Sequence, residues 1–412
     1  MAQVTGTLVP KSDFPLLERK VHDHALVYLD SASSSQRPQK VLDAMDRYYE
    51  RSHANVHRGV YSIAEEADSH YDSARLKVGR FIGAPSPATE VIFVKNATEG
   101  LNMVAATWSA LNLKEGDSVL LTEMEHHANL VPWLMLAERR GIELRWLDID
   151  DAYRLELSDL DRLTDGVKVV ACTVMSNVLG TIPPFSKIAE AAHAAGAVVV
   201  ADAAQAVPHM PVDVGSLGCD FLAFSAHKML GPTGIGVLWG REELLEAMPP
   251  FMGGGGMIQD VRKEGFTPNA LPWKFEAGTP PIAEAVGLAT AVDYLSEIGM
   301  DRVIEHDRDL TAYAQRLLAD RFGKALRIFG PAGTEDRGGV LSLELEGVHP
   351  HDLAQVLDQS GVCVRAGNHC AKPLMRRLGV NATARASFYV YNDDSDVDAL
   401  AEALERAASL FA

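Results

Sequence analysis

The stretch that decides the fold spans residues 221–236 and reads FLAFSAHKMLGPTGIG. It joins an apolar, strand-like run to a glycine-rich turn, and Lys228 stands at the junction. A second apolar run, AVVVADAAQ at 197–205, carries Asp202 and Gln205 at its end. Pyridoxal phosphate (PLP) needs a lysine for its imine and an acid that keeps its pyridine nitrogen protonated. The two runs therefore predict a PLP site, although Lys228 could also be a surface lysine and Asp202 a turn former.

Outward from this stretch, short β-branched runs alternate with helical patterns such as SKIAEAAHAAG between residues 91 and 240. The strand-like runs are VIFV, SVLLT, VKVVACTV, AVVVAD, FLAFSA and GVLWG. This alternation predicts an α/β domain with a mainly parallel sheet covered by helices. Ligands of such sheets collect at the carboxyl ends of the strands, where Asp202 and Lys228 fall.

The rest of the chain predicts a second, smaller domain. Residues 251–281 are rich in glycine and proline, which indicates a long functional loop. Helices near 282–298 and 301–321 follow, and then come the strand VLSLELEG, a helix from His351, the strands VCVRAG and RASFYVY, and a final helix. We expect a segment at 1–26 that packs with the small domain, a large PLP-binding domain at 27–295, and a small α+β domain at 296–412 that carries a cysteine loop.

Size and composition exclude several classes of protein. The chain has 412 residues, 47% of them hydrophobic, which is enough for two domains with a substantial core. Its formal net charge of −18 argues against nucleic acid, because affinity for phosphate backbones comes largely from lysine and arginine. We find neither a signal sequence nor an apolar segment near the roughly 20 residues that cross a bilayer. Four cysteines without a CxxC pair do not form a disulfide framework, so we expect a cytoplasmic protein.

Six motifs together carry a family resemblance. SAHKMLGPTG, DAAQAV, EHHAN, SNVLG, FEAGTP and RAGNHCAKPLM occur in the order seen in SUF-type (group II) cysteine desulfurases, which belong to the class V aminotransferase family. The similarity runs from about Tyr28 to the C-terminus. It implies a PLP-dependent transferase of fold type I and a homodimer. It also implies conversion of L-cysteine to L-alanine, with transfer of the sulfur to an enzyme cysteine as a persulfide that supplies iron–sulfur cluster assembly.

The resemblance assigns the residues around the cofactor ring. Lys228 would hold PLP, its pKa lowered by burial and nearby positive charge. Asp202 would pair with the pyridine nitrogen, and Gln205 with the phenolic oxygen. His126 would stack on the ring and relay protons, a task suited to a pKa near neutrality. His126 is favoured over His127, although either could be a core histidine.

The cofactor phosphate would be bound at a helix start. Thr98 would offer its hydroxyl and backbone N–H there, where free amides favour an anion, unless it is only an N-cap. Ser225 and His227 correspond to further phosphate ligands. Thr279 resembles a residue that the neighbouring subunit donates, which implies a homodimer.

Other positions match residues that hold the substrate. Arg385 and Asn177 would bind the substrate carboxylate, and Asn177 also belongs to the cofactor pocket. Arg365 resembles a second active-site arginine, although a surface ion pair is its plain alternative. His57 and Arg58, in NVHRGVY, match an active-site loop but could also be surface residues.

The sulfur-accepting residue would be Cys370. A thiolate is the nucleophile in such attack, and Arg365, His369 or the cofactor's charges would help to lower its pKa. Asn368 departs from the RxGHHC pattern of the family, so any mechanism that needs both histidines is in doubt. The remaining cysteines are expected to be inert apolar residues: Cys172, Cys219 and Cys363.

One histidine points to a partner, and other functions remain open. His351, in GVHPHD, resembles the position that engages a zinc-containing sulfur acceptor of the SufU kind as a transient zinc ligand, although it could simply lie near a helix N-cap.

The nearest alternative activities are selenocysteine lyase and cysteine sulfinate desulfinase. Less favoured are an aminotransferase, a silent scaffold for iron–sulfur assembly, and a metal-binding module built from the 14 histidines.

Overall fold

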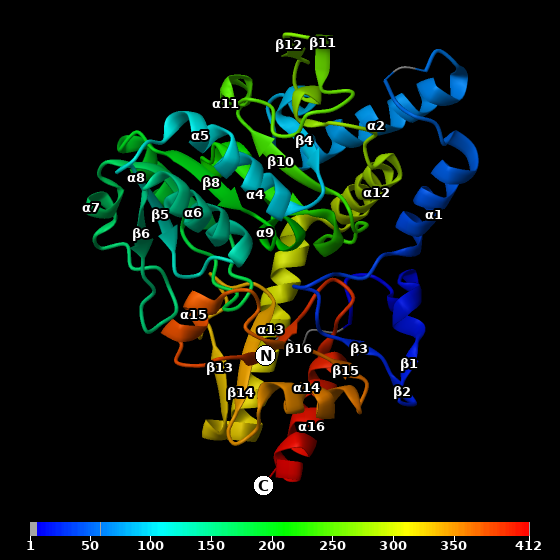
Figure 1. The fold of residues 1–412 in the computed structure, drawn as a ribbon. Coiled ribbons are helices and arrows are strands. Elements are labelled where there is room, and N and C mark those ends of the chain that lie inside the picture. The colour runs from blue at the N-terminus through cyan, green and yellow to red at the C-terminus, as the bar shows by residue number, and fades with distance from the viewer. Residues whose placement is uncertain (1–5, 58, 412) are drawn as a thin grey trace.

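The computed structural model describes residues 6–57 and 59–411 and has two domains joined by long helices (Figure 1). The large domain is built on a seven-stranded sheet in the order β4-β10-β9-β8-β7-β5-β6. Its strands are β4 (Val91–Val94), β5 (Ser118–Thr122), β6 (Glu143–Leu147), β7 (Val167–Thr173), β8 (Val198–Asp202), β9 (Phe221–Ser225) and β10 (Gly236–Gly240). Arg58 lies outside the described residues.

The sheet is mixed, with a parallel centre. β9, β8, β7, β5 and β6 run parallel, whereas β10 is antiparallel to both β9 and β4. The prediction of a mainly parallel α/β sheet is confirmed, and every strand run named from the sequence between residues 91 and 240 forms a strand. β6 was not predicted because ELRWL places the polar Glu143 and Arg145 in a sheet-edge strand that is only partly buried.

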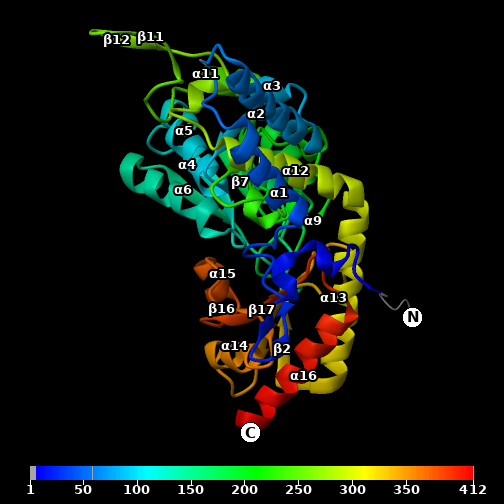
Figure 2. The same ribbon diagram turned by 90° about the vertical axis from the view of Figure 1, so that its right-hand side faces the viewer.

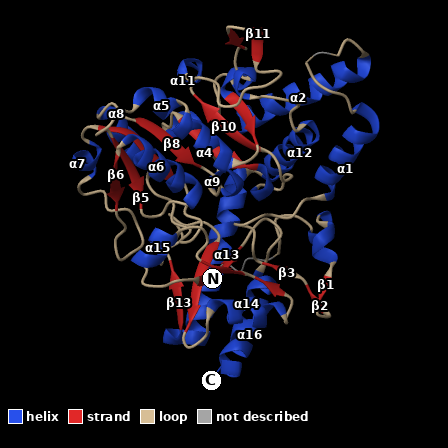
Figure 3. Cartoon of the chain, in the orientation of Figure 1, coloured by secondary structure: helices blue, strands red, loops and turns tan. Residues whose placement is uncertain are grey.

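Helices cover both faces of this sheet. Successive strand residues point to opposite faces, so Val170 belongs to the core cluster with buried residues from 64–78, 185–192 and 282–298, whereas Val169 belongs to the cluster with buried residues from 97–105 and 128–136. The helices of this domain are α1 (Gln39–Arg47), α2 (Ser62–Phe81), α3 (Pro87–Glu90), α4 (Ala97–Ala106), α5 (Trp108–Asn112), α6 (His127–Arg140), α7 (Leu160–Thr164), α8 (Phe185–Ala194), α9 (Ala206–His209), α10 (Val214–Leu217), α11 (Glu242–Ala247) and α12 (Ile282–Ile298). Figure 3 shows the strands enclosed between these helices.

The small domain has a four-stranded antiparallel sheet in the order β13-β14-β17-β16. The elements of this part are β13 (Leu326–Phe329), β14 (Val340–Leu345), β15 (Val362–Cys363), β16 (Arg365–Gly367), β17 (Thr383–Ser387), α13 (Met300–Phe322), α14 (Pro350–Asp358), α15 (Lys372–Arg377) and α16 (Asp394–Phe411). The helix α12 ends at Ile298, and α13 begins two residues later after Gly299, whose φ is 88°. α13 then runs down the small domain toward the C-terminal end of the molecule (Figure 2).

The N-terminal segment contacts the small domain. It contains β1 (Lys20–Val21), β2 (His24–Ala25) and β3 (Val27–Tyr28), and β3 pairs in parallel with β15. The backbone N–H of Leu8 donates to the carbonyl of Val390 at 3.1 Å, and Lys11 forms an ion pair with Asp396 at 2.8 Å.

Three local predictions are wrong. The run VCVRAG is not one strand, because Val364 separates β15 from β16 and the two strands belong to different sheets. The strand in RASFYVY stops at Ser387, after which the buried aromatic residues fill the core instead of pairing. The segment 251–281 contains a hairpin, β11 (Ile258–Arg262) and β12 (Gly265–Pro268), that projects from the domain (Figure 2). Among the described helices, none is both long and apolar enough to cross a membrane.

Candidate active site

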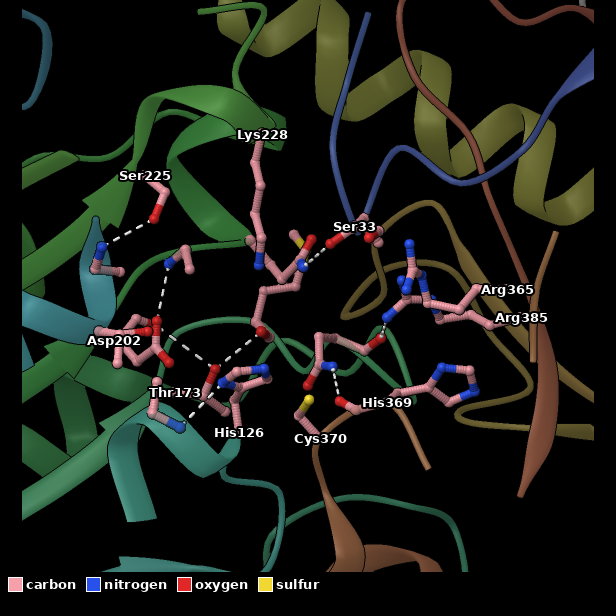
Figure 4. A pocket seen from close by; sticks show the side chains of 18 of the residues that line it. Ser33, His126, Thr173, Asp202, Ser225, Lys228, Arg365, His369, Cys370 and Arg385 are labelled. Atoms are coloured by element: carbon pink, nitrogen blue, oxygen red, sulfur yellow. Dashed lines mark hydrogen bonds between the residues drawn. The ribbon is translucent and has the colours of Figure 1, made fainter. Parts of the chain in front are cut away.

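A pocket of about 540 Å³ lies between the two domains at the carboxyl ends of β5, β7, β8 and β9 (Figure 4). The start of α4 and the small-domain segment around β16 and β17 complete its wall. Most site residues predicted from the sequence line it: Thr98, His126, Asn177, Asp202, Gln205, Ser225, His227, Lys228, Arg365, Cys370 and Arg385. His351 also lines it, at the start of α14.

Lys228 and Asp202 extend into this pocket from neighbouring strands. Lys228 ends the short 3-10 helix that follows β9, and Asp202 is the last residue of β8 and only 4% exposed. Burial lowers the pKa of Lys228 to about 8, an effect that Arg385 adds to and Asp202 opposes. The prediction of a lowered lysine pKa is therefore confirmed. Burial raises the pKa of Asp202, and the Lys228 ammonium counteracts that rise.

The start of α4 offers a backbone amide to the pocket. The Asn96 side chain caps this helix by accepting from the Glu99 N–H at 3.0 Å, and Ser225 Oγ accepts from the Ala97 N–H at 2.9 Å. The exposed Thr98 lies between these two amides and lines the pocket. The hydrogen bonds found among the described residues leave the Thr98 N–H free for a ligand. Asn96 was missed from the sequence, although the Asn-x-x-Glu spacing of NATE is a helix-start signal.

His126 caps α6 and faces the pocket. Its Nδ1 accepts from the Ala128 N–H at 3.0 Å, so Nε2 carries the proton of the neutral ring. Burial, and then the charge of Lys228, lower the pKa of His126 to about 3. The prediction of a near-neutral pKa is wrong, because burial disfavours the charged imidazolium and the neighbouring Lys228 disfavours it further. His126 therefore acts as a neutral group.

The residue before His126 anchors this turn. The Glu125 carboxyl is 1% exposed and accepts from Thr122 Oγ1 at 2.7 Å, from Asn129 Nδ2 at 2.6 Å and from the Thr173 N–H at 2.9 Å. Burial raises the pKa of Glu125 to about 8. These bonds tie β5, α6 and β7 together and explain why Glu and Asn flank the histidines of EHHAN.

Two arginines lie directly opposite each other on neighbouring strands, Arg365 on β16 and Arg385 on β17. Asp30, missed from the sequence, lies between them. Arg365 binds both Asp30 oxygens through Nε at 3.1 Å and Nη2 at 2.8 Å, whereas Arg385 approaches Asp30 at 3.4 Å. Arg385 also donates to the Asn177 carbonyl at 2.9 Å, and its buried Nε has no partner in the described chain. Arg385 thus keeps one buried N–H without a partner in the described chain, whereas Arg365 is engaged by both oxygens of Asp30.

Cys370 is exposed and sits in a tightly held loop. Its φ is 55° and that of His369 is 50°, a left-handed region that costs residues other than glycine about 1–2 kcal/mol each. Asn368 Oδ1 accepts from the Cys370 N–H at 3.0 Å, and Asn177 Nδ2 donates to the His369 carbonyl at 2.8 Å. Asn368 thus has a structural use in this turn.

His369 does not supply the positive charge that was predicted to assist Cys370. Its ring is 6% exposed, and Nε2 contacts Thr383 Oγ1 at 2.8 Å. Burial, and then Arg385, lower the pKa of His369 to about 3, so the ring is neutral. In Figure 4 the ring points away from the thiol. Of the three alternatives named from the sequence, Arg365, His369 or the cofactor, His369 is therefore excluded as a source of positive charge.

Two predicted residues lie elsewhere in this chain. Thr279 lines a separate pocket of about 340 Å³ together with Tyr71 and Glu276. The His57 ring lies near Tyr71 and Trp273, with centroid distances of 5.9 and 6.0 Å, and is not part of the Lys228 pocket. A single subunit therefore does not bring Thr279 or His57 to Lys228.

The donor set of the pocket fits PLP. Gln205 is 3% exposed and donates to the Ala32 carbonyl at 2.7 Å, which leaves its Oε1 and one N–H without a partner among the described residues. The buried carboxyl of Asp202 is suited to pair with a protonated pyridine nitrogen, and the Lys228 amine is suited to react with an aldehyde. The backbone amides at the start of α4 are suited to bind a phosphate. The pocket thus offers a separate group for each polar end of the cofactor.

Comparisons with known proteins agree with this geometry. Residues 27–400 match the family model described as aminotransferase class-V. A probable cysteine desulfurase of Streptomyces coelicolor is 51% identical, with 100% of each chain covered, and a cysteine desulfurase of Haloferax volcanii is 47% identical over 98% of this chain and 97% of its own. The apo cysteine desulfurase of Thermococcus onnurineus superposes with a TM-score of 0.93 at 39% identity over 99% of this chain and 100% of its own. The Escherichia coli cysteine desulfurase CsdA gives a TM-score of 0.88 at 39% identity over 98% of each chain. The chain therefore belongs to the class V aminotransferase family.

Proposed function

We propose that this protein is a PLP-dependent cysteine desulfurase that converts L-cysteine to L-alanine and receives the sulfur on Cys370 as a persulfide. One observation carries the proposal: the exposed Cys370 thiol and the Lys228 amine line one pocket. The full-length similarity to cysteine desulfurases at up to 51% identity supports it. When bound, PLP supplies an electron sink beside the substrate Cα.

Residues of the pocket bind the substrate and move its protons. Arg385 binds the substrate carboxylate, and the Asn177 carbonyl fixes the guanidinium that does so. Lys228 takes the Cα proton as a neutral amine, a state that its lowered pKa favours. His126 holds a proton on Nε2, facing the pocket.

Sulfur transfer then depends on Cys370. Its thiolate forms a bond to the substrate sulfur while the Cβ–S bond breaks, and the carbon keeps the electron pair and is protonated. L-cysteine and the enzyme thiol thus become L-alanine and an enzyme persulfide, with atoms and electrons in balance.

The direct test incubates the purified protein with PLP and L-cysteine, quantifies alanine, and locates added sulfur by mass spectrometry. We expect alanine and a one-sulfur mass increase on the peptide that contains Cys370. Pyruvate in place of alanine would contradict the proposal, and added sulfur on Cys363 would overturn the assignment of the acceptor.

The physiological acceptor in this proposal is a SufU-type zinc protein of a SUF iron–sulfur system. The exposed His351 lines the mouth of the Cys370 pocket, and the neighbouring His349 accepts from the His351 N–H through Nδ1 at 3.3 Å. A free imidazole there is suited to replace one ligand of a partner's zinc. We expect His351→Ala to abolish stimulation by such an acceptor and to spare turnover without it. Equal stimulation of both proteins would contradict this role.

The proposal also includes a cytoplasmic homodimer. Val60 is 96% exposed and Tyr61 54% exposed, beside the His57 loop, and such apolar surface is suited to a subunit interface. A partner would then deliver Thr279 and His57, which a single chain keeps away from Lys228. Light scattering should give twice the mass of one chain, and a monomer with full activity would refute the dimer. Fractionation of cells tests the location.

A further inference from the structure

The loop that carries Cys370 is held against the large domain by a histidine that the mechanism above does not use. The backbone N–H of His127 donates to the Cys370 carbonyl at 2.7 Å, and the His127 side chain accepts from the Lys372 N–H through Nε2 at 3.1 Å. Lys372 is the first residue of α15, so the imidazole satisfies one of the free amides at the start of that helix. One residue at the start of α6 therefore contacts the Cys370 carbonyl and the amide two residues later.

The contacts of His127 help to hold a strained backbone conformation in the loop. Two consecutive residues, His369 and Cys370, have left-handed backbones, and neither is glycine. Such a turn persists only where its surroundings hold it. Within the loop, Asn368 accepts from the Cys370 N–H, and from the large domain Asn177 donates to the His369 carbonyl. His127 accepts from the Lys372 N–H, where the loop enters α15.

A second link attaches α15 to the large domain at its other end. Arg377 donates to the Ile149 carbonyl at 2.8 Å and lies 3.6 Å from the Glu123 carboxylate. These contacts hold the far end of α15, whereas His127 contacts its first turn, next to the thiol. The ring of His127 does not line the Lys228 pocket, so its contribution is separate from cofactor binding.

We propose that His127 is a positioning residue that fixes the sulfur-accepting loop on the large domain and thereby places Cys370 for attack. The inference rests on the proposed desulfurase function. Because Nε2 must accept a hydrogen bond, the ring is neutral with its proton on Nδ1. A side chain with an acceptor at the place of Nε2 should substitute for it, and an apolar ring should not.

The test compares His127→Phe, which keeps the ring shape, with His127→Gln, whose amide oxygen can occupy the place of Nε2. We expect His127→Phe to lower kcat for alanine formation by about 10- to 100-fold while the KM for L-cysteine stays within about twofold, because misplacement by about 1 Å has effects of this size. His127→Gln should recover most of the loss. His24→Phe, at an exposed site on β2, is the matched control and should behave as the wild type.

Hydrogen exchange of the peptide 368–374 gives a readout that does not need activity. We expect exchange in the PLP-bound protein to be about 5- to 10-fold faster in His127→Phe than in the wild type, and close to the wild-type rate in His127→Gln. Unchanged exchange in His127→Phe would overturn the inference, as would equal loss of kcat in both variants. Failure of the proposed function is distinguishable, since the wild type would then make no alanine while the exchange difference remained.

Discussion

Replacing Lys228 by alanine should abolish alanine formation, with a loss of at least about 10³-fold in kcat. In the proposed function this amine would hold the cofactor and take the Cα proton, and among the described residues no other lysine lines the pocket. The measurement is alanine released from L-cysteine by protein supplied with excess PLP. Turnover within tenfold of the wild type would refute the assignment of Lys228.

Lys228→Arg separates charge from nucleophilicity. It keeps a cation beside Asp202, so the fold and the buried carboxylate should be preserved, yet it cannot bind the cofactor covalently. We expect it to be as inactive as Lys228→Ala and to lack the visible absorbance of a lysine-bound cofactor. An active arginine variant would show that only the positive charge matters.

The same lysine predicts how cofactor uptake depends on pH. Only a neutral amine attacks an aldehyde, and burial lowers the Lys228 pKa from 10.5 to about 8. At pH 7 roughly a tenth of the amine is then neutral, compared with roughly 0.03% for an ordinary lysine. The rate of covalent PLP uptake by the apoprotein should therefore rise between pH 6 and about 8 and level off above it.

The part of the site that the sequence predicts well is the part carried by strands. Asp202 and Lys228 each follow a short apolar run, and parallel strands bring their carboxyl ends to one edge, so spacing along the chain becomes proximity in space. Arg385 lies within a buried strand of the small domain, where an arginine needs a partner and therefore signals a function.

The features that the sequence did not reveal depend on contacts between distant segments. Asp30 pairs with an arginine 335 positions away, and nothing in DSASSSQ indicates that partner. The pKa of His126 falls because separate elements enclose it and place Lys228 beside it. The role of His127 depends equally on a loop more than 240 residues further along. The local sequence pattern predicts helices and strands, whereas the ion pair of Asp30, the pKa of His126 and the contacts of His127 depend on how distant segments pack together.

Replacing Cys370 by serine should remove the persulfide and reduce alanine formation by about 10²-fold or more, while PLP uptake stays normal. A hydroxyl fills the same space but is far less nucleophilic at neutral pH, so the substrate sulfur has no acceptor. The visible spectrum separates this loss from damage to the cofactor site, because Cys370 lies on the small-domain wall, opposite Lys228. The measurements are alanine release and mass spectrometry of the cysteine peptides.

Cys363→Ser is the matched control for that substitution. Cys363 is half-buried in β15, seven positions before Cys370, and burial raises the pKa of its thiol, so less thiolate is present there. We expect this variant to form persulfide and alanine as the wild type does. If Cys370→Ser kept the wild-type rate with L-cysteine, sulfur would be leaving without a protein thiol. That result would refute the assignment of Cys370 as the sulfur acceptor, because a lyase reaction on the same scaffold would explain the alanine formed.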